Sequence, residues 1–152
     1  MVGKLSFRLL VAVVLLISTL GSGVHASTPE SCLKAAAQHH KVDYMLLLAI
    51  AQVESGLNPG AVGRNTNGTS DRGLMQINDW WLPKLARFGI SRQSLMEPCV
   101  SAFVGAWILS HEISRHGSTW KAVGSYNSPT TKQQLIYARR VKEKLSELVS
   151  GR

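Results

Sequence analysis

The chain has 152 residues, of which 45% are hydrophobic and 17% are charged. This length fits one domain with one core, and the composition favours a folded chain over a disordered one. The net charge of +8 at pH 7 predicts attraction to anionic surfaces. The basic residues are scattered, and the one dense stretch, residues 139–142, is typical of a solvated helix face, so we expect no nucleic-acid partner.

The first 26 residues have the pattern of a secretory signal peptide. Two basic residues precede an apolar run at residues 9–20, and Val24-His25-Ala26 places small residues where a signal peptidase recognises them. The run is shorter than the ~20 residues of a membrane-spanning helix. We expect residues 1–26 to be cleaved on export to the periplasm, leaving residues 27–152 as one domain without a stable membrane anchor; an uncleaved anchor is the alternative.

Cys32 and Cys99 are the only cysteines in the chain. In an exported protein an even pair of this kind indicates a disulfide, and two buried free thiols are the alternative. On the chain-entropy model a crosslink closing so long a loop stabilises the fold by roughly 4 kcal/mol.

Helical spacing of apolar residues predicts a mainly α-helical chain, with helices at residues 31–40, 44–55, 79–88, 99–116, 120–126 and 131–149. The second of these begins after Asp43, a good N-cap, ends at Gly56, and is apolar nearly all round, as a buried central helix is. Between the second and third helices, residues 60–72 form a long polar loop with room for at most a small irregular hairpin. Residues 73–78 are expected to be extended.

The last helix is expected to be amphipathic. Its apolar residues recur at helical spacing and are expected to form one buried face, which consists of Leu135, Ala138, Val141, Leu145 and Leu148.

Glu54 is an unusual residue for its position. It falls in the last turn of the helix expected to be most buried, near the negative end of the helix dipole and among apolar neighbours. Both effects disfavour the carboxylate and raise its pKa, as a general acid for glycosidic-bond cleavage requires. The alternative is a glutamate that turns out of the helix end into solvent.

Three motifs follow one another along the chain: Glu54-Ser55-Gly56-Leu57-Asn58-Pro59, Gly73-Leu74-Met75-Gln76-Ile77-Asn78 and Tyr126-Asn127. Together they resemble the Slt-type lytic transglycosylase family, over roughly residues 32–148. The resemblance implies a lysozyme-like fold of the goose type. The chain is most similar to the small, exported, single-domain members associated with type III secretion, conjugation or type IV pilus systems, which share its length, signal peptide and cysteine pair.

The resemblance also implies roles for single residues. Glu54 matches the catalytic acid/base, Ser55 the serine that supports it, and Tyr126 the tyrosine that contacts the catalytic carboxyl. Substrate contacts are implied for Gly73, Leu74, Met75, Gln76, Asn127 and Tyr137.

The implied reaction cleaves the bond between N-acetylmuramic acid and N-acetylglucosamine in peptidoglycan and leaves a 1,6-anhydro ring, without a cofactor or a metal. The implied partners are the glycan strands and components of a secretion or pilus apparatus, and we expect a monomer.

The sequence departs from the family pattern in two places. Ser101-Ala102 stands where the family often has Asn-Ile, and Ser128-Pro129 stands where the third motif usually continues with Ala-Gly. The first change concerns support behind the cleft, and the second concerns the shape of one wall.

Only Glu54 among the carboxylates lies in a motif. Asp71 and Asp79 flank the second motif, where we expect a turn residue and a helix cap. Because a glycoside hydrolase ordinarily uses two carboxylates, this favours a transglycosylase. A hydrolytic lysozyme on the same fold, with Asp71 as its second carboxylate, and a non-catalytic wall-binding assembly protein are the alternatives.

Two weaker patterns remain. His111-Glu112 followed by His116 has one residue more than the zinc motif H-E-x-x-H, so the histidines do not share a helix face, and we expect no metal. The tryptophans can stack on sugar rings, although we expect core packing for at least two of the set Trp80, Trp81, Trp107 and Trp120.

Overall fold

The computed structural model describes residues 27–151. The signal peptide expected at residues 1–26 therefore lies outside the described residues. Within residues 27–151, no helix is both long enough and apolar enough to cross a membrane.

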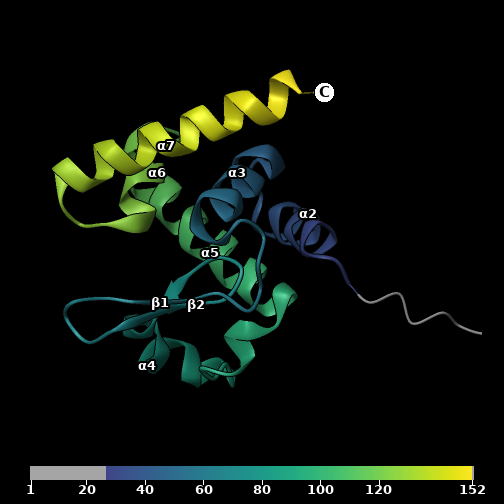
Figure 1. The fold of residues 1–152 in the computed structure, drawn as a ribbon, viewed down its shortest axis with the longest axis vertical. Helices are drawn as coiled ribbons and strands as arrows, with labels where there is room; N and C mark the ends of the chain where they lie inside the picture. The colour runs from purple at the N-terminus through teal and green to yellow at the C-terminus, as the bar shows by residue number, and fades with distance from the viewer. Residues whose placement is uncertain (1–26, 152) are drawn as a thin grey trace, which may run out of the picture.

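Five longer helices make up most of the molecule (Figure 1): α2 (Pro29–His40), α3 (Tyr44–Ser55), α5 (Pro98–His116), α6 (Trp120–Asn127) and α7 (Thr131–Ser150). The shorter elements are β1 (Val62–Arg64), β2 (Ser70–Arg72), β3 (Ile77–Asn78), η1 (Asp79–Trp81), α4 (Leu82–Leu85), η2 (Ala86–Phe88) and η3 (Ser94–Met96). The mainly helical fold predicted from the sequence is confirmed.

Helix α3 has the bounds that the sequence predicts. The Asp43 side chain accepts a hydrogen bond from the backbone N–H of Leu46 at 2.7 Å, and Gly56 ends the helix in the left-handed conformation with φ of 62°. Leu47 and Ile50 are fully buried, and the helix packs between α2 and α7. This packing fixes the position of the last turn of α3, which carries Glu54.

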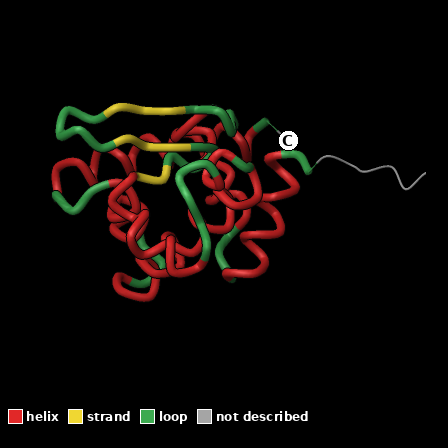
Figure 2. Tube along the Cα trace, turned by 90° about the horizontal axis from the view of Figure 1, so that it is seen from below, coloured by secondary structure: helices red, strands yellow, loops and turns green. Residues whose placement is uncertain are grey.

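The polar loop and the end of the second motif form a small antiparallel sheet of three strands in the order β1-β2-β3. Figure 2 shows the strands at one edge of the helical body. The predicted hairpin is present, as β1 and β2, with Val62 opposite Arg72. The extended segment expected at residues 73–78 is confined to β3, because the chain turns at Gly73 and Gln76, whose φ angles are 75° and 46°.

Two helices differ from the sequence prediction. The expected helix at residues 79–88 is broken into η1, α4 and η2, because Pro83 has no N–H to donate to the residue four positions earlier. On α7, the predicted face is confirmed at Ala138 and Val141, which are buried, and at Leu145 and Leu148, which pack against the core. Leu135, expected on the same face, is 66% exposed, and Tyr137 is buried in addition.

The predicted disulfide is present and joins Cys32 of α2 to Cys99 at the start of α5. The two cysteines are 67 positions apart in the sequence, and their Cα atoms are 4.6 Å apart. Cys32 is buried between α2 and α5, which pack along each other. The crosslink therefore fixes the N-terminal helix to the helix that supports the second motif.

The second motif (residues 73–78) packs closely against α5 and the segment before it. A Cβ atom added to Gly73 would lie 1.9 Å from the carbonyl oxygen of Leu95 and 2.9 Å from the hydroxyl of Ser101. A Cβ atom added to Gly105 of α5 would lie within 2.8 Å of the Met75 side chain. Ser101, one of the departures from the family pattern, accepts a hydrogen bond from the Met75 backbone N–H at 3.1 Å. This serine directly supports the motif.

Gly73→Ala is expected to lower the free energy of unfolding by about 3 kcal/mol or more, because the new methyl group meets backbone and φ is positive. Gly68→Ala is the matched control: its φ is also positive, at 83°, but nothing lies within 4 Å of the added atom, so a loss of about 1 kcal/mol is expected. Urea unfolding of both variants measures the difference, and equal losses would contradict the close approach at Gly73.

Candidate functional site

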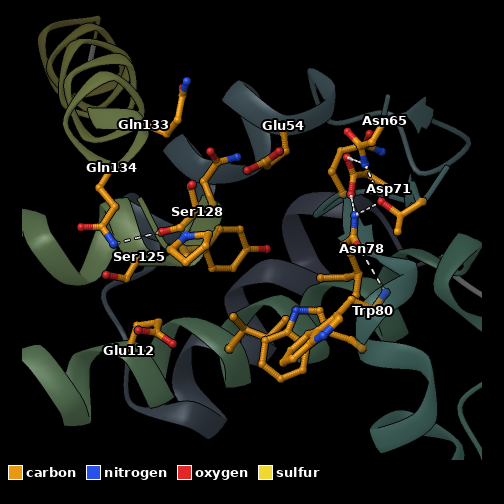
Figure 3. A pocket seen from close by; sticks show the side chains of 18 of the residues that line it. Glu54, Asn65, Asp71, Asn78, Trp80, Glu112, Ser125, Ser128, Gln133 and Gln134 are labelled. Carbon is orange, nitrogen blue, oxygen red and sulfur yellow. Dashed lines mark hydrogen bonds between the residues drawn. The ribbon is translucent and has the colours of Figure 1, made fainter. Parts of the chain in front are cut away.

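A cleft of about 1390 Å³ runs across the molecule between the sheet on one side and helices α5, α6 and the start of α7 on the other. Figure 3 shows Glu54 at the upper wall, Asp71, Asn78 and Trp80 on one side, and Glu112 on the opposite side. The cleft brings together residues from widely separated parts of the chain.

Glu54 lies in the last turn of α3. Its side chain is held by a hydrogen bond that Oε1 accepts from the hydroxyl of Tyr137. Burial raises the pKa of Glu54 to about 7, and the charge of Asp71 acts in the same direction. The Tyr137 hydrogen bond and the charge of Arg140 lower the pKa of Glu54 and offset only part of this rise. The raised pKa expected from the sequence is present, so the protonated carboxyl is accessible near neutral pH. The alternative, a glutamate fully turned out into solvent, is not what the structure shows.

The tyrosine that contacts Glu54 is Tyr137, and the expectation that Tyr126 makes this contact is wrong. The Tyr126 hydroxyl donates to the backbone carbonyl of Met75 at 2.9 Å. The two rings lie nearly parallel, with centroids 6.4 Å apart and an interplanar angle of 19°. Tyr126 thus fixes the second motif and flanks Tyr137, which in turn fixes the carboxyl.

Ser55, the residue after Glu54, ties the end of α3 to the second motif. Its hydroxyl donates to the carbonyl of Leu74 at 2.8 Å and accepts from the backbone N–H of Asn58 at 3.1 Å. The hydroxyl therefore orients the helix end that carries the carboxyl, without contacting the carboxyl itself.

Of the six residues expected to contact substrate, only Gln76 and Asn127 line the cleft. The Gln76 amide group donates to the carbonyls of Ala61 and Gly73, at 3.1 and 2.9 Å, so its side chain is held in place at the cleft wall. The other four residues lie behind the wall and support it: Gly73, Leu74, Met75 and Tyr137. Direct sugar contact by Leu74, Met75 and Tyr137 is contradicted by their burial, at 0%, 0% and 3% exposure.

Asp71 faces the cleft from the middle of β2 and is not the turn residue that the sequence suggested. Its carboxylate accepts hydrogen bonds from the side-chain amides of Asn65 and Asn78, at 2.9 and 2.7 Å. Asn78, not Asp79, caps the η1 turn, with its side chain accepting from Trp80 N–H. No sequence pattern predicted this amide network, although Asn78 is the last residue of the second motif.

Asp79 and Glu112 are both neutralised by basic partners. Asp79 forms ion pairs with Arg72 at 3.1 Å and Arg92 at 3.3 Å. Glu112 is buried in the opposite cleft wall, with Arg115 at 3.4 Å and His116 at 3.5 Å. Glu54, in contrast, has a neutral hydroxyl as its hydrogen-bond partner.

The two histidines of the zinc-like pattern, His111 and His116, contact different residues. His116 contacts Glu112, whereas the ring of His111 stacks on Trp107, with centroids 6.4 Å apart. Within residues 27–151, no group of three or more histidine, cysteine or acidic residues is placed to hold a metal ion.

The pKa of Glu54 is expected to move in opposite directions in two variants. Tyr137→Phe removes a hydrogen bond that stabilises the carboxylate, so the pKa should rise above about 7. Asp71→Asn removes a negative charge that disfavours the carboxylate, so the pKa should fall. Carbon-13 NMR titration of the Glu54 carboxyl carbon, assigned by Glu54→Gln, measures both shifts.

Glu143→Gln serves as the control, because Glu143 is exposed on α7 and lies outside the cleft wall. It should leave the Glu54 titration unchanged. Shifts of the same sign in Tyr137→Phe and Asp71→Asn would contradict the assigned causes.

The chain is similar to proteins of a known family. The family model described as Transglycosylase SLT domain matches residues 31–146. The chain is 42% identical over 117 residues to Invasion protein IagB of Salmonella typhimurium (strain SL1344), covering 76% of this chain and 73% of that protein. It is 38% identical over 115 residues to Protein IpgF of Shigella flexneri, covering 72% of this chain and 76% of that protein.

A solved structure shares the fold. The chain is similar to an inactive variant of lytic transglycosylase Slt from Pseudomonas aeruginosa, with a TM-score of 0.61 and 22% sequence identity. The similarity covers 80% of this chain and 23% of that one. The chain therefore belongs to the transglycosylase SLT domain family and has its mainly helical, lysozyme-like fold.

Proposed function

We propose that this protein is a peptidoglycan lytic transglycosylase that cleaves the β-1,4 bond between N-acetylmuramic acid and N-acetylglucosamine. The observation that carries the proposal is the Glu54 carboxyl, which faces a cleft of about 1390 Å³ and has its pKa raised to about 7. Such a carboxyl is protonated often enough at neutral pH to act as a general acid. Membership of the family supports the same reaction.

In the proposed mechanism, Glu54 first donates its proton to the glycosidic oxygen as the bond to C1 of the muramoyl sugar breaks. The N-acetyl group of that sugar assists at C1, in place of a protein nucleophile. The Glu54 carboxylate then accepts the proton of the C6 hydroxyl as its oxygen bonds to C1. The product ends in a 1,6-anhydro ring, no water is consumed, and Glu54 regains its proton.

Tyr137 and Ser55 act through Glu54 in this scheme. The Tyr137 hydroxyl holds Oε1 and stabilises the carboxylate form, which is the base in the second step. Ser55 holds the helix end against the second motif. Both are positioning residues.

Hydrolysis on the same fold is the second candidate, and Asp71 is the observation that favours it. Its carboxylate faces the same cleft and is near enough to raise the pKa of Glu54. An Asp71 carboxylate held by two amides could activate a water molecule. The C6 hydroxyl, however, is already part of the reacting sugar and has a large effective concentration.

Digestion of purified sacculi in oxygen-18 water separates the two candidates. We expect released muropeptides to end in 1,6-anhydro-N-acetylmuramic acid, one water lighter than a hydrolysis product and without the heavy label. Mass spectrometry of the fragments measures both properties. Label at the muramoyl ends of most fragments would mean that the protein is a lysozyme with Asp71 as its second carboxylate.

Glu54→Gln is expected to reduce release of muropeptides by at least ~100-fold, because the amide has a similar shape but cannot deliver a proton. In the parent protein the rate should fall as the pH rises above about 7, where the Glu54 carboxyl loses its proton. Thermal unfolding of the variant checks that the fold is kept. Activity within a few-fold of the parent would exclude Glu54 as the acid, whereas no muropeptide release by the folded parent itself would favour a non-catalytic wall-binding protein.

The cellular setting is part of the proposal. We propose that residues 1–26 direct export to the periplasm and are removed, and that the remaining domain, residues 27–152, acts there as a monomer on glycan strands. The similarity to Invasion protein IagB supports a role in opening the wall for a secretion or pilus apparatus.

A further inference from the structure

The four tryptophans have different surroundings. Trp81 and Trp107 are half-buried against the core, and the Lys84 ammonium lies over both rings, 5.6 and 5.0 Å from their centroids. Trp120 has the Lys142 ammonium 5.9 Å from its ring and is not part of the cleft wall. Each of these three indoles already has a cation over its ring.

Trp80 differs from the other three. It lines the cleft, as Trp81 does, but unlike Trp81 it is 71% exposed, and among residues 27–151 no cation lies over its ring. Its one aromatic neighbour is Trp81, with centroids 4.8 Å apart and an interplanar angle of 83°. A T-shaped contact of this kind covers at most one face of the indole, so the other face is open to the cleft.

The backbone beneath Trp80 is fixed. Its N–H donates to the Asn78 side chain at 2.9 Å, and the Asn78 amide donates to Asp71 at 2.7 Å. The backbone that carries the indole is therefore attached to the same hydrogen-bonded network that forms one wall of the cleft (Figure 3). A large apolar ring left exposed at a cleft edge on a fixed backbone is typical of a binding site.

We infer that Trp80 forms a subsite that stacks on a pyranose ring of the glycan strand. The inference rests on the proposed function, which places such a strand in the cleft. The C–H groups on one face of a pyranose are apolar, and an open indole face provides the matching surface. Figure 3 shows Trp80 on the side of the cleft that carries Asp71 and Asn78, away from Glu54, so the stacked sugar is one that is not being cleaved.

Phe88 provides a matched control. It is also 71% exposed, but it lies outside the cleft wall. Because the two side chains are equally exposed, the general effects of losing a surface aromatic ring should be equal in the two variants. Only the Trp80 variant should affect glycan binding.

The test measures binding of peptide-free peptidoglycan glycan strands by calorimetry, with every variant built on Glu54→Gln to prevent turnover. We expect Trp80→Ala to weaken binding by about 3- to 10-fold and Trp80→Phe, which keeps an aromatic face, to restore most of the loss. Phe88→Ala should bind as the parent does. Thermal unfolding verifies that all variants are folded.

Equal binding by Trp80→Ala and the parent would overturn the subsite and would leave a protein-docking role for the exposed indole. A similar loss in Phe88→Ala would overturn it as well, because the effect would then not depend on the cleft. Failure of the folded parent to bind glycan strands at all would overturn the proposed function together with this inference. The two failures are thus distinguished by the behaviour of the parent.

Discussion

Three helices each contribute a side-chain hydroxyl that forms a hydrogen bond with the backbone of Leu74 or Met75. Ser55 of α3 donates to the Leu74 carbonyl, Tyr126 of α6 donates to the Met75 carbonyl, and Ser101 of α5 accepts from the Met75 N–H. These bonds join segments that are distant in the sequence to one short turn. Buried backbone groups require such partners, so the loss of any one hydroxyl would leave a polar group unpaired near the cleft.

This arrangement explains why the first half of the second motif does not contact the cleft. Leu74 and Met75 are fully buried, and Gly73 is in contact with backbone that would exclude any side chain. The second half of the motif, Gln76, Ile77 and Asn78, lines the cleft. Its buried half holds α3 in place relative to α5 and α6, and hence fixes the position of the Glu54 carboxyl.

The carboxyl groups of the cleft differ in their surroundings. Glu112 is balanced by Arg115 and His116, and Asp71 is held by two amides. Glu54 is half-buried, and loss of solvation raises its pKa to about 7, although the hydrogen bond from the Tyr137 hydroxyl acts in the opposite direction. Desolvation without a positively charged hydrogen-bond partner thus sets Glu54 apart, in line with the proton transfer that we propose for it.

Much of this could be predicted from local sequence. The caps at Asp43 and Gly56 define α3, and the apolar character of that helix predicts the raised pKa of Glu54. The family motifs identify the right residues but not their contacts. Tyr126 and Tyr137 are 11 positions apart on consecutive helices, and the packing of α7 against α3 brings the Tyr137 hydroxyl to Glu54.

The parts that could not be predicted depend on tertiary contacts or on a single backbone group. Pro83 breaks a segment whose apolar spacing is otherwise helical. Asp71 follows a run of turn-forming residues, yet it pairs with Gly63 and Asn78 in a sheet whose register depends on strands of two or three residues. Strands this short have too little side-chain alternation to be recognised.

The Cys32–Cys99 crosslink makes the stability of this fold depend on its surroundings. In a compartment that keeps thiols reduced, the chain lacks the roughly 4 kcal/mol that closing so long a loop contributes, which is a large part of the stability of an ordinary domain. A reduced chain therefore unfolds more readily and is more exposed to proteases, and a loosely folded chain of this kind suits the export that we propose. Oxidation locks α2 onto α5, so under the proposed export the rigid form of the fold would be reached only in the oxidising compartment.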